Sequence, residues 1–126
     1  MINYLAVFIG GGLGSALRYA ANSFLGNYAH LNLPYATFLV NALGSFILGF
    51  LFIFFMHKTD LSHTARVALT VGFCGGLTTF STFSFEVFNY FEQGQILLAL
   101  GYILLSVTVC VLMVALGIAA GTCLLK

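Results

Sequence analysis

The chain has 126 residues, of which 61% are hydrophobic and 6% are charged, and its formal net charge at pH 7 is +1. A soluble domain carries about 25% charged residues, so this composition excludes a soluble globular protein and predicts an integral membrane protein. The near-neutral charge and the lack of a basic run give no reason to expect a nucleic-acid partner. Because a helix needs about 20 apolar residues to cross a bilayer, the length predicts one all-α transmembrane domain over residues 1–126, with four crossings.

The first predicted crossing covers residues 3–25 and is rich in glycine. Gly10 and Gly14 form a G-x-x-x-G face, which allows two helices to approach closely. This face is either a generic packing surface or the surface that seats this helix against the third crossing. Arg18 follows one turn after Gly14. Because a charge within a crossing is costly, Arg18 either reaches the nearer interface or forms an electropositive vestibule that attracts an anion.

The second predicted crossing, residues 34–56, carries one amide within apolar sequence. Asn41, Ser45 and Gly49 are four residues apart and therefore share one helix face. In hydrocarbon the Asn41 amide needs partners for both its donors and its acceptor. Asn41 either hydrogen-bonds to a neighbouring helix or points a donor into an ion pathway.

The third predicted crossing, residues 64–91, is longer than a straight span requires and contains GFCGGLTTFSTFSFE, from Gly72 to Glu86. Glycine weakens a helix interior, and Ser and Thr can satisfy the backbone groups that an interruption leaves without partners. We therefore expect two half-helices that meet between Gly75 and Thr79, with the interruption as the functional site. Glu86 lies beyond it and is either a functional carboxylate or a solvated or Arg-paired interfacial residue.

Two phenylalanines lie beside the hydroxyls of this stretch. Phe80 and Phe83 are one helical turn apart, so they can present their ring edges along one line. The edge of an aromatic ring is positive, and ring edges together with hydroxyl donors suit a small, hard anion. The alternative is a pair that faces lipid or the protein core.

The fourth predicted crossing, residues 96–125, has a mildly polar stripe. Tyr102, Ser106 and Cys110 occur at every fourth position and lie on one helix face. Ordinary packing is one interpretation of this stripe, and a polar track is the other.

The distribution of cations bears on orientation. With four crossings, the termini and the middle connection lie on one side of the membrane, and that side carries Lys58, Arg66 and Lys126. Arg18 lies toward the other side, so the count favours cytoplasmic termini. Four cations give a faint bias, and insertion in both orientations, as in an antiparallel dimer, stays open.

The predicted spans contain no Ser/His/Asp or Cys/His arrangement and no pair of carboxylates, so we do not expect an enzyme. Hydroxyls, an amide and backbone groups without helical partners can instead replace the hydration shell of an ion. A small multidrug resistance transporter is the alternative, but it needs a membrane carboxylate that the first crossing lacks. A non-transporting assembly protein would leave the cluster of hydroxyls and phenylalanines unexplained.

Three motifs occur in chain order: GGGLGSALRY near the start, TFLVNALGSFILG in the second crossing and GFCGGLTTFSTFSFE in the third. Together they resemble the Fluc fluoride channel family, also called CrcB-like, over essentially the whole chain. The resemblance implies a dual-topology antiparallel homodimer in the lipid of a bacterial inner membrane. Such a channel exports fluoride passively, rejects chloride and has two pores along the dimer interface.

The resemblance also implies roles for individual residues. The fluoride pathway would include Phe80, Phe83, Asn41, Ser81, Thr82, Tyr102 and Ser106, with Arg18 and Glu86 as vestibule charges. Backbone carbonyls of Gly75 and Thr78 from each subunit would hold a structural sodium ion that is not transported. At Cys110 the chain departs from the hydroxyl that is common at that position of the family.

Overall fold

The computed structural model describes residues 1–26, 34–57 and 60–125, and all regular structure within these ranges is helical. In chain order the helices are α1 (Ile2–Gly26), α2 (Tyr35–His57), α3 (His63–Val67), the π-helix η1 (Ala68–Cys74), α4 (Gly75–Leu77), α5 (Phe80–Glu92) and α6 (Ile96–Leu124). The prediction of an all-α protein is therefore confirmed for the described residues. The cations Lys58 and Lys126, used in the topology prediction, lie outside them.

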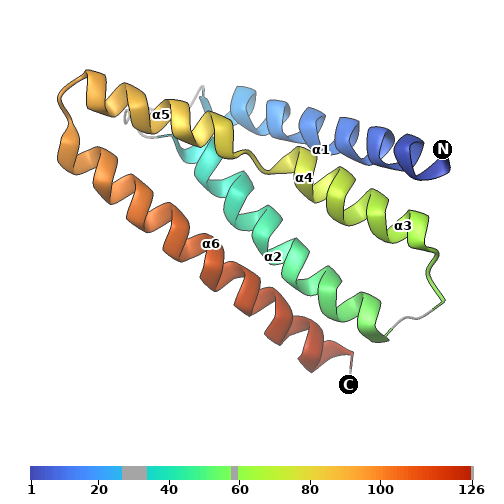
Figure 1. Ribbon diagram of the computed structural model, residues 1–126. Coiled ribbons are helices and arrows are strands. Elements are labelled where there is room, and N and C mark those ends of the chain that lie inside the picture. The colour runs from blue at the N-terminus through green and yellow to red at the C-terminus, as the bar shows by residue number, and fades with distance from the viewer. Residues whose placement is uncertain (27–33, 58–59, 126) are drawn as a thin grey trace.

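The helices form four rods, because α3, η1, α4 and α5 follow one another along a single interrupted crossing (Figure 1). Figure 1 shows α2 and α6 side by side, whereas α1 lies along α3, η1 and α4. Beyond the interruption, α5 packs against α6, to which a tight turn containing Gly94 (φ 71°) connects it. The start of α1 and the end of α6 lie at the same end of the bundle as the end of α2 and the start of α3 (Figure 1).

Three helical segments are long and apolar enough to cross a membrane: Tyr35–His57, His63–Glu92 and Ile96–Leu124. Large apolar side chains are also exposed along α1 and α6, as expected for surfaces that face lipid. These are the features of a multi-pass membrane protein. With 25 residues α1 has sufficient length, but its glycines and polar residues make it less apolar than α2 and α6. Length and hydropathy therefore identify three of the four predicted crossings. The first predicted crossing, which corresponds to α1, is not established by them.

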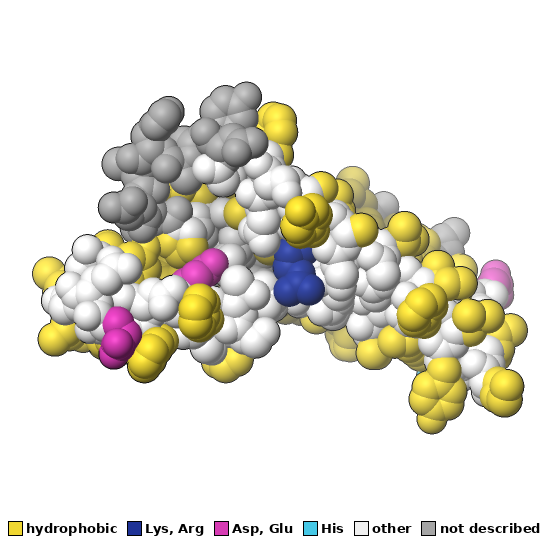
Figure 2. Space-filling view, turned by 90° about the horizontal axis from the view of Figure 1, so that it is seen from above, with side chains coloured by type: hydrophobic (Ala, Val, Ile, Leu, Met, Phe, Trp, Pro, Cys, Tyr) yellow, Lys and Arg dark blue, Asp and Glu magenta, His cyan; other side chains and the backbone are white. Residues whose placement is uncertain are grey.

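Few charged side chains interrupt the apolar surface. Among the described residues the charged side chains are Arg18, Arg66, Asp60, Glu86 and Glu92. Figure 2 shows basic side-chain surface near the middle of one face, with acidic side chains apart from it on both sides. The surface therefore lacks the dense mixed charge of a soluble domain.

Close packing between α1 and the third crossing depends on glycine. A Cβ atom at Gly14 would collide with the carbonyl oxygen of Phe73 and lie 2.7 Å from the backbone nitrogen of Leu77. A Cβ atom at Gly76 would collide with the carbonyl oxygen of Gly11. Backbone therefore lies against backbone, and the prediction that the G-x-x-x-G face seats the first helix against the third crossing is confirmed.

The third crossing is interrupted at two threonines, and not at the glycine pair that suggested the interruption. Gly75 has helical torsion angles (φ −65°, ψ −35°). Thr78 (φ −81°, ψ 156°) and Thr79 (φ −150°, ψ 120°) are extended, and α5 begins at Phe80. The interruption is thus found at the end of the expected interval. Gly76 serves the contact with α1 instead, because that contact leaves no room for a side chain, whereas a Cβ atom at Gly75 would make only an ordinary contact with the Thr70 carbonyl oxygen.

A small buried cluster holds α5 against α6 and fixes the rings beside the interruption. Its members are Phe83, Val87, Tyr90, Ala99 and Tyr102, with Phe38 and Ile103 packed against them. The Tyr90 and Tyr102 rings meet edge to face, with centroids 6.2 Å apart. Phe83 is therefore positioned by a packed core, although it also faces the site described next.

Candidate functional site

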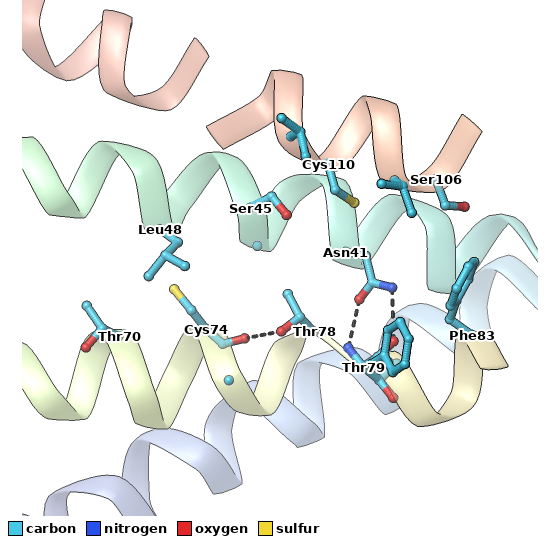
Figure 3. A pocket seen from close by; sticks show the side chains of 15 residues that line it. Asn41, Ser45, Leu48, Thr70, Cys74, Thr78, Thr79, Phe83, Ser106 and Cys110 are labelled. Atoms are coloured by element: carbon cyan, nitrogen blue, oxygen red, sulfur yellow. Dashed lines mark hydrogen bonds between the residues drawn. The ribbon is translucent and has the colours of Figure 1, made fainter. Parts of the chain in front are cut away.

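An open groove of about 430 Å³ lies between α2, the interrupted third crossing and α6 (Figure 3). Its walls combine apolar side chains with hydroxyls, one amide and two thiols. The lining residues are Asn41, Gly44, Ser45, Leu48, Thr70, Cys74, Gly75, Thr78, Thr79, Phe80, Phe83, Ser106, Val107, Cys110 and Val111. The interruption therefore opens onto a continuous space within the bundle.

The groove brings together most of the residues predicted to form the site. Asn41, Gly75, Thr78, Phe80, Phe83 and Ser106 all line it. The residues Ser81, Thr82, Tyr102, Arg18 and Glu86 are not among its lining residues. Four of the latter lie in hydrogen-bond networks next to the groove, described below, and Arg18 is half-buried on α1.

The side chain of Asn41 binds the backbone of Thr79 through two hydrogen bonds. Asn41 Nδ2 donates to the Thr79 carbonyl oxygen (3.1 Å), and the Thr79 amide donates to Asn41 Oδ1 (2.7 Å), as the dashed lines in Figure 3 show. The amide thus replaces the backbone partners that an extended residue would find in a sheet. Of the two interpretations of Asn41, the contact with a neighbouring helix is observed. The second N–H of Nδ2 has no partner among the residues that the structure describes, so it is available for a ligand.

Threonine hydroxyls stabilise the two ends that meet at the interruption. Thr78 Oγ1 donates to the Cys74 carbonyl oxygen (2.8 Å) at the end of α4. Thr79 is the N-cap of α5, and its Oγ1 accepts from the Thr82 amide (3.2 Å) and donates to Thr82 Oγ1 (3.0 Å). Ser81 Oγ lies 3.4 Å from the same Thr79 oxygen. Thr79 is 7% exposed, so these bonds replace water that cannot reach the backbone there.

Two backbone carbonyls lose their usual helical partners at the interruption. In a continuous α-helix the Gly75 carbonyl would accept from the Thr79 amide, and the Thr78 carbonyl from the Thr82 amide. Here the Thr79 amide donates to Asn41 Oδ1 and the Thr82 amide to Thr79 Oγ1. Both carbonyls belong to residues that line the groove, so their oxygens can accept from, or coordinate, something else.

Aromatic rings form the wall of the groove at α5. The Phe80 and Phe83 ring centroids are 5.7 Å apart with an interplanar angle of 42°. Phe83 also contacts the Tyr102 ring, with centroids 5.1 Å apart. Phe80 is 77% exposed, whereas Phe83 is 8% exposed. One ring is therefore fixed by the core, and the other projects from the groove without cover from this chain.

Glu86 is held by two hydroxyls from different helices. Thr37 Oγ1 of α2 donates to Glu86 Oε1 (2.6 Å), and the Tyr102 hydroxyl of α6 donates to Glu86 Oε2 (2.9 Å). No ion pair joins Glu86 to a cation within the described part of the chain, so the Arg-paired interpretation is not observed there. A cavity of about 150 Å³ lies beside the carboxylate, between Asn22 at the end of α1 and Tyr35 at the start of α2.

Two site residues escaped the sequence analysis. Thr37 is 2% exposed and binds Glu86, and it precedes Asn41 by four residues. The spacing that joins Asn41 to Ser45 therefore extends back to Thr37 and would have identified it. Thr70 lines the groove one turn before Cys74, and it belongs to the π-helix η1, which the sequence analysis did not predict.

Comparison with known proteins identifies the family. A family profile described as "CrcB-like protein, Camphor Resistance (CrcB)" matches residues 5–118. A protein of Geotalea daltonii named "Fluoride-specific ion channel FluC" is 45% identical over 116 residues, which cover 90% of this chain and 94% of that protein. "Fluoride-specific ion channel FluC 1" of Yersinia pestis is 48% identical over 82% of this chain and 80% of its own. "Fluoride-specific ion channel FluC" of Hahella chejuensis is 42% identical over 90% of this chain and 89% of its own.

The profile match spans nearly the whole chain and includes every residue of the groove. The interrupted third crossing and the three apolar helical segments are consistent with the ion channels that these relatives are named as. The chain therefore belongs to the CrcB-like family, whose relatives above are named as ion channels and not as enzymes.

Proposed function

We propose that this chain forms a fluoride-specific ion channel through which fluoride leaves the cell passively, down its electrochemical gradient. Relatives at 42–48% identity carry the name of such a channel. The observation that carries the proposal is the groove at the interruption, where an amide, hydroxyls and two phenylalanine rings face one space. None of the described residues that line the groove carries the carboxylate that a proton-coupled exporter of cations would need.

The groove offers donors that suit an anion. A small anion gives up its water only where fixed donors replace it. Within the described part of the chain, one N–H of Asn41 is free, and Ser106 Oγ is buried with no hydrogen-bond partner. Phe80 and Phe83 add the positive edges of their rings. We infer that these four residues form the pathway, with Ser81, Thr82 and Tyr102 at its border, where they bind Thr79 and Glu86.

A second copy of the chain would complete this pathway. The groove is open along one side, and polar groups at membrane depth cannot face lipid without a large cost in free energy. The 77% exposed Phe80 ring lies where a partner subunit would cover it. We propose an antiparallel, dual-topology homodimer with two pores in a bacterial inner membrane. In that assembly α1 would be the fourth crossing, and Arg18 and Glu86 would lie in the vestibules.

A structural sodium ion would fit between two such subunits. The carbonyls of Gly75 and Thr78 have each lost the amide partner of a continuous helix. Carbonyl oxygens are suitable ligands for a hard cation. Two of them are too few to replace a hydration shell, so a partner subunit would have to supply the matching pair. An ion held in this way would link the subunits and would not be transported.

The test is efflux from liposomes that contain the purified protein, with sodium present, followed with a fluoride electrode beside a chloride-loaded control. The proposal expects rapid loss of fluoride and retention of chloride. Phe80→Ile and Phe83→Ile should each reduce the fluoride flux while the dimer stays intact, because isoleucine has no polarised ring edge.

Phe88→Ile is the matched control. Phe88 is on the same helix, is 56% exposed and does not line the groove, so its replacement should leave fluoride flux unchanged. Retention of fluoride by a correctly assembled wild-type protein would contradict the channel. Unchanged flux in both groove variants would contradict the role of the ring edges.

A further inference from the structure

The hydroxyl groups that line the groove differ in whether they already donate their proton in a hydrogen bond within the protein. Thr70 Oγ1 donates to the Arg66 carbonyl oxygen (2.8 Å), and Thr78 Oγ1 donates to the Cys74 carbonyl oxygen (2.8 Å). A hydroxyl has a single proton, so in this geometry neither threonine can donate to an anion. Thr79 Oγ1 likewise donates its proton to Thr82 Oγ1.

Two serines in the groove have no such bond. Ser106 Oγ on α6 is buried and has no partner among the described residues. Ser45 on α2 lies one turn after Asn41, and no hydrogen bond joins its Oγ to another residue in the described part of the chain. Serine in a helix commonly donates to the carbonyl four residues earlier, as Ser84 does to Phe80 (2.9 Å). Ser45 does not make this bond within the described part of the chain, so its hydroxyl proton is available to a ligand in the groove.

The wall of the groove formed by α6, across from Ser45, carries a weak hydrogen-bond donor, the thiol of Cys110. Cys110 follows Ser106 by one turn on α6, and a thiol is a much weaker hydrogen-bond donor than a hydroxyl. Figure 3 shows the Cys110 sulfur and the Ser45 hydroxyl turned toward the same part of the groove, from α6 and α2 respectively. In addition to Asn41 and Ser106, the strong hydrogen-bond donor on this path is thus the hydroxyl of Ser45 on α2.

We propose that Ser45 is a fluoride-binding residue of the pathway, and that its hydroxyl supplies the donor that the thiol of Cys110 does not. The inference rests on the proposed function, because it assigns the next step of the same path. It also assigns the step to α2, on the face that Ser45 shares with Asn41, whereas the stripe of Tyr102, Ser106 and Cys110 lies on α6.

The experiment measures initial fluoride efflux from liposomes for wild type, Ser45→Ala and Ser45→Ala/Cys110→Ser. Loss of one hydrogen bond to an ion should slow efflux by about tenfold in Ser45→Ala. The added serine at position 110 should recover most of the lost rate, because a hydroxyl then faces the same part of the groove. Ser45→Cys, which is nearly isosteric, should also be slow and guards against a packing defect.

Thr122→Ala is the control for removal of a hydroxyl. Its Oγ1 donates to the Ile118 carbonyl oxygen (2.8 Å) near the end of α6, away from the groove, so its efflux should equal that of the wild type. A Ser45→Ala rate within about twofold of wild type, or a loss that Cys110→Ser does not reverse, would overturn the proposal. Absence of fluoride efflux from the wild type would instead contradict the proposed function itself.

Discussion

The hydrogen bonds between Asn41 and Thr79 give the sharpest test of how the interruption is maintained. Asn41→Ala removes a donor and an acceptor at once and leaves the Thr79 amide without a partner. Because Thr79 is 7% exposed, water cannot take over these bonds without rearrangement. A buried backbone group without a partner costs about 1–3 kcal/mol, whereas hydrogen bonds between membrane helices average about 0.6 kcal/mol each. Together these values predict a loss of about 2 kcal/mol.

The assay is unfolding of the purified protein in mixed micelles by a denaturing detergent, followed by helix content. Protein concentration must be fixed, because assembly contributes to apparent stability. Asn22→Ala is the matched control, since Asn22 is exposed on α1 and makes no hydrogen bond within the described ranges. Both variants gain the higher helix propensity of alanine, so the difference between them isolates the two bonds. If Asn41→Ala unfolds within about 0.5 kcal/mol of Asn22→Ala, the amide does not hold the interruption.

Two further predictions concern packing and capping. Gly14→Ala should destabilise the protein by about 1–3 kcal/mol in the same unfolding assay, because its methyl group would collide with the Phe73 carbonyl oxygen. Gly12→Ala is the control and should be neutral or stabilising, because no atom lies within 4 Å of a Cβ at that position. Equal stability of these variants would contradict the close contact between α1 and η1. Thr79→Ala should cost about 1 kcal/mol through loss of the N-cap bond to the Thr82 amide, and Thr79→Ser should restore it. A serine variant no more stable than the alanine variant would show that capping is not the cause.

Much of the architecture follows from local patterns. Apolar runs longer than 20 residues predict helices that cross a membrane, and small residues at Gly10 and Gly14 predict a face for close approach. A long third crossing with clustered glycines and hydroxyls predicts an interruption near residues 75–79. Each of these signals is visible because spacing along a helix determines which side chains share a face.

These patterns do not predict which residues within this interval leave the helix, or which side chain binds their backbone. Glycine is common both where helices break and where they pack, so the sequence could not separate the two uses of Gly75 and Gly76. The structure assigns Gly76 to the contact with α1 and the interruption to Thr78 and Thr79. The reason is tertiary, since the side chain that binds the Thr79 backbone comes from Asn41, 38 residues earlier.

The same distinction holds for Glu86 and for the groove. The amino-acid sequence is enough to predict a helical membrane protein and the set of polar residues available within its crossings, because composition and helical period depend only on the chain. Which of these residues meet depends on how the helices pack: Thr37 and Tyr102 bind Glu86, and Ser106 Oγ has no hydrogen-bond partner among the described residues. Which hydroxyl protons are used and which are free depends on how three helices pack around one interruption, and no local pattern encodes that.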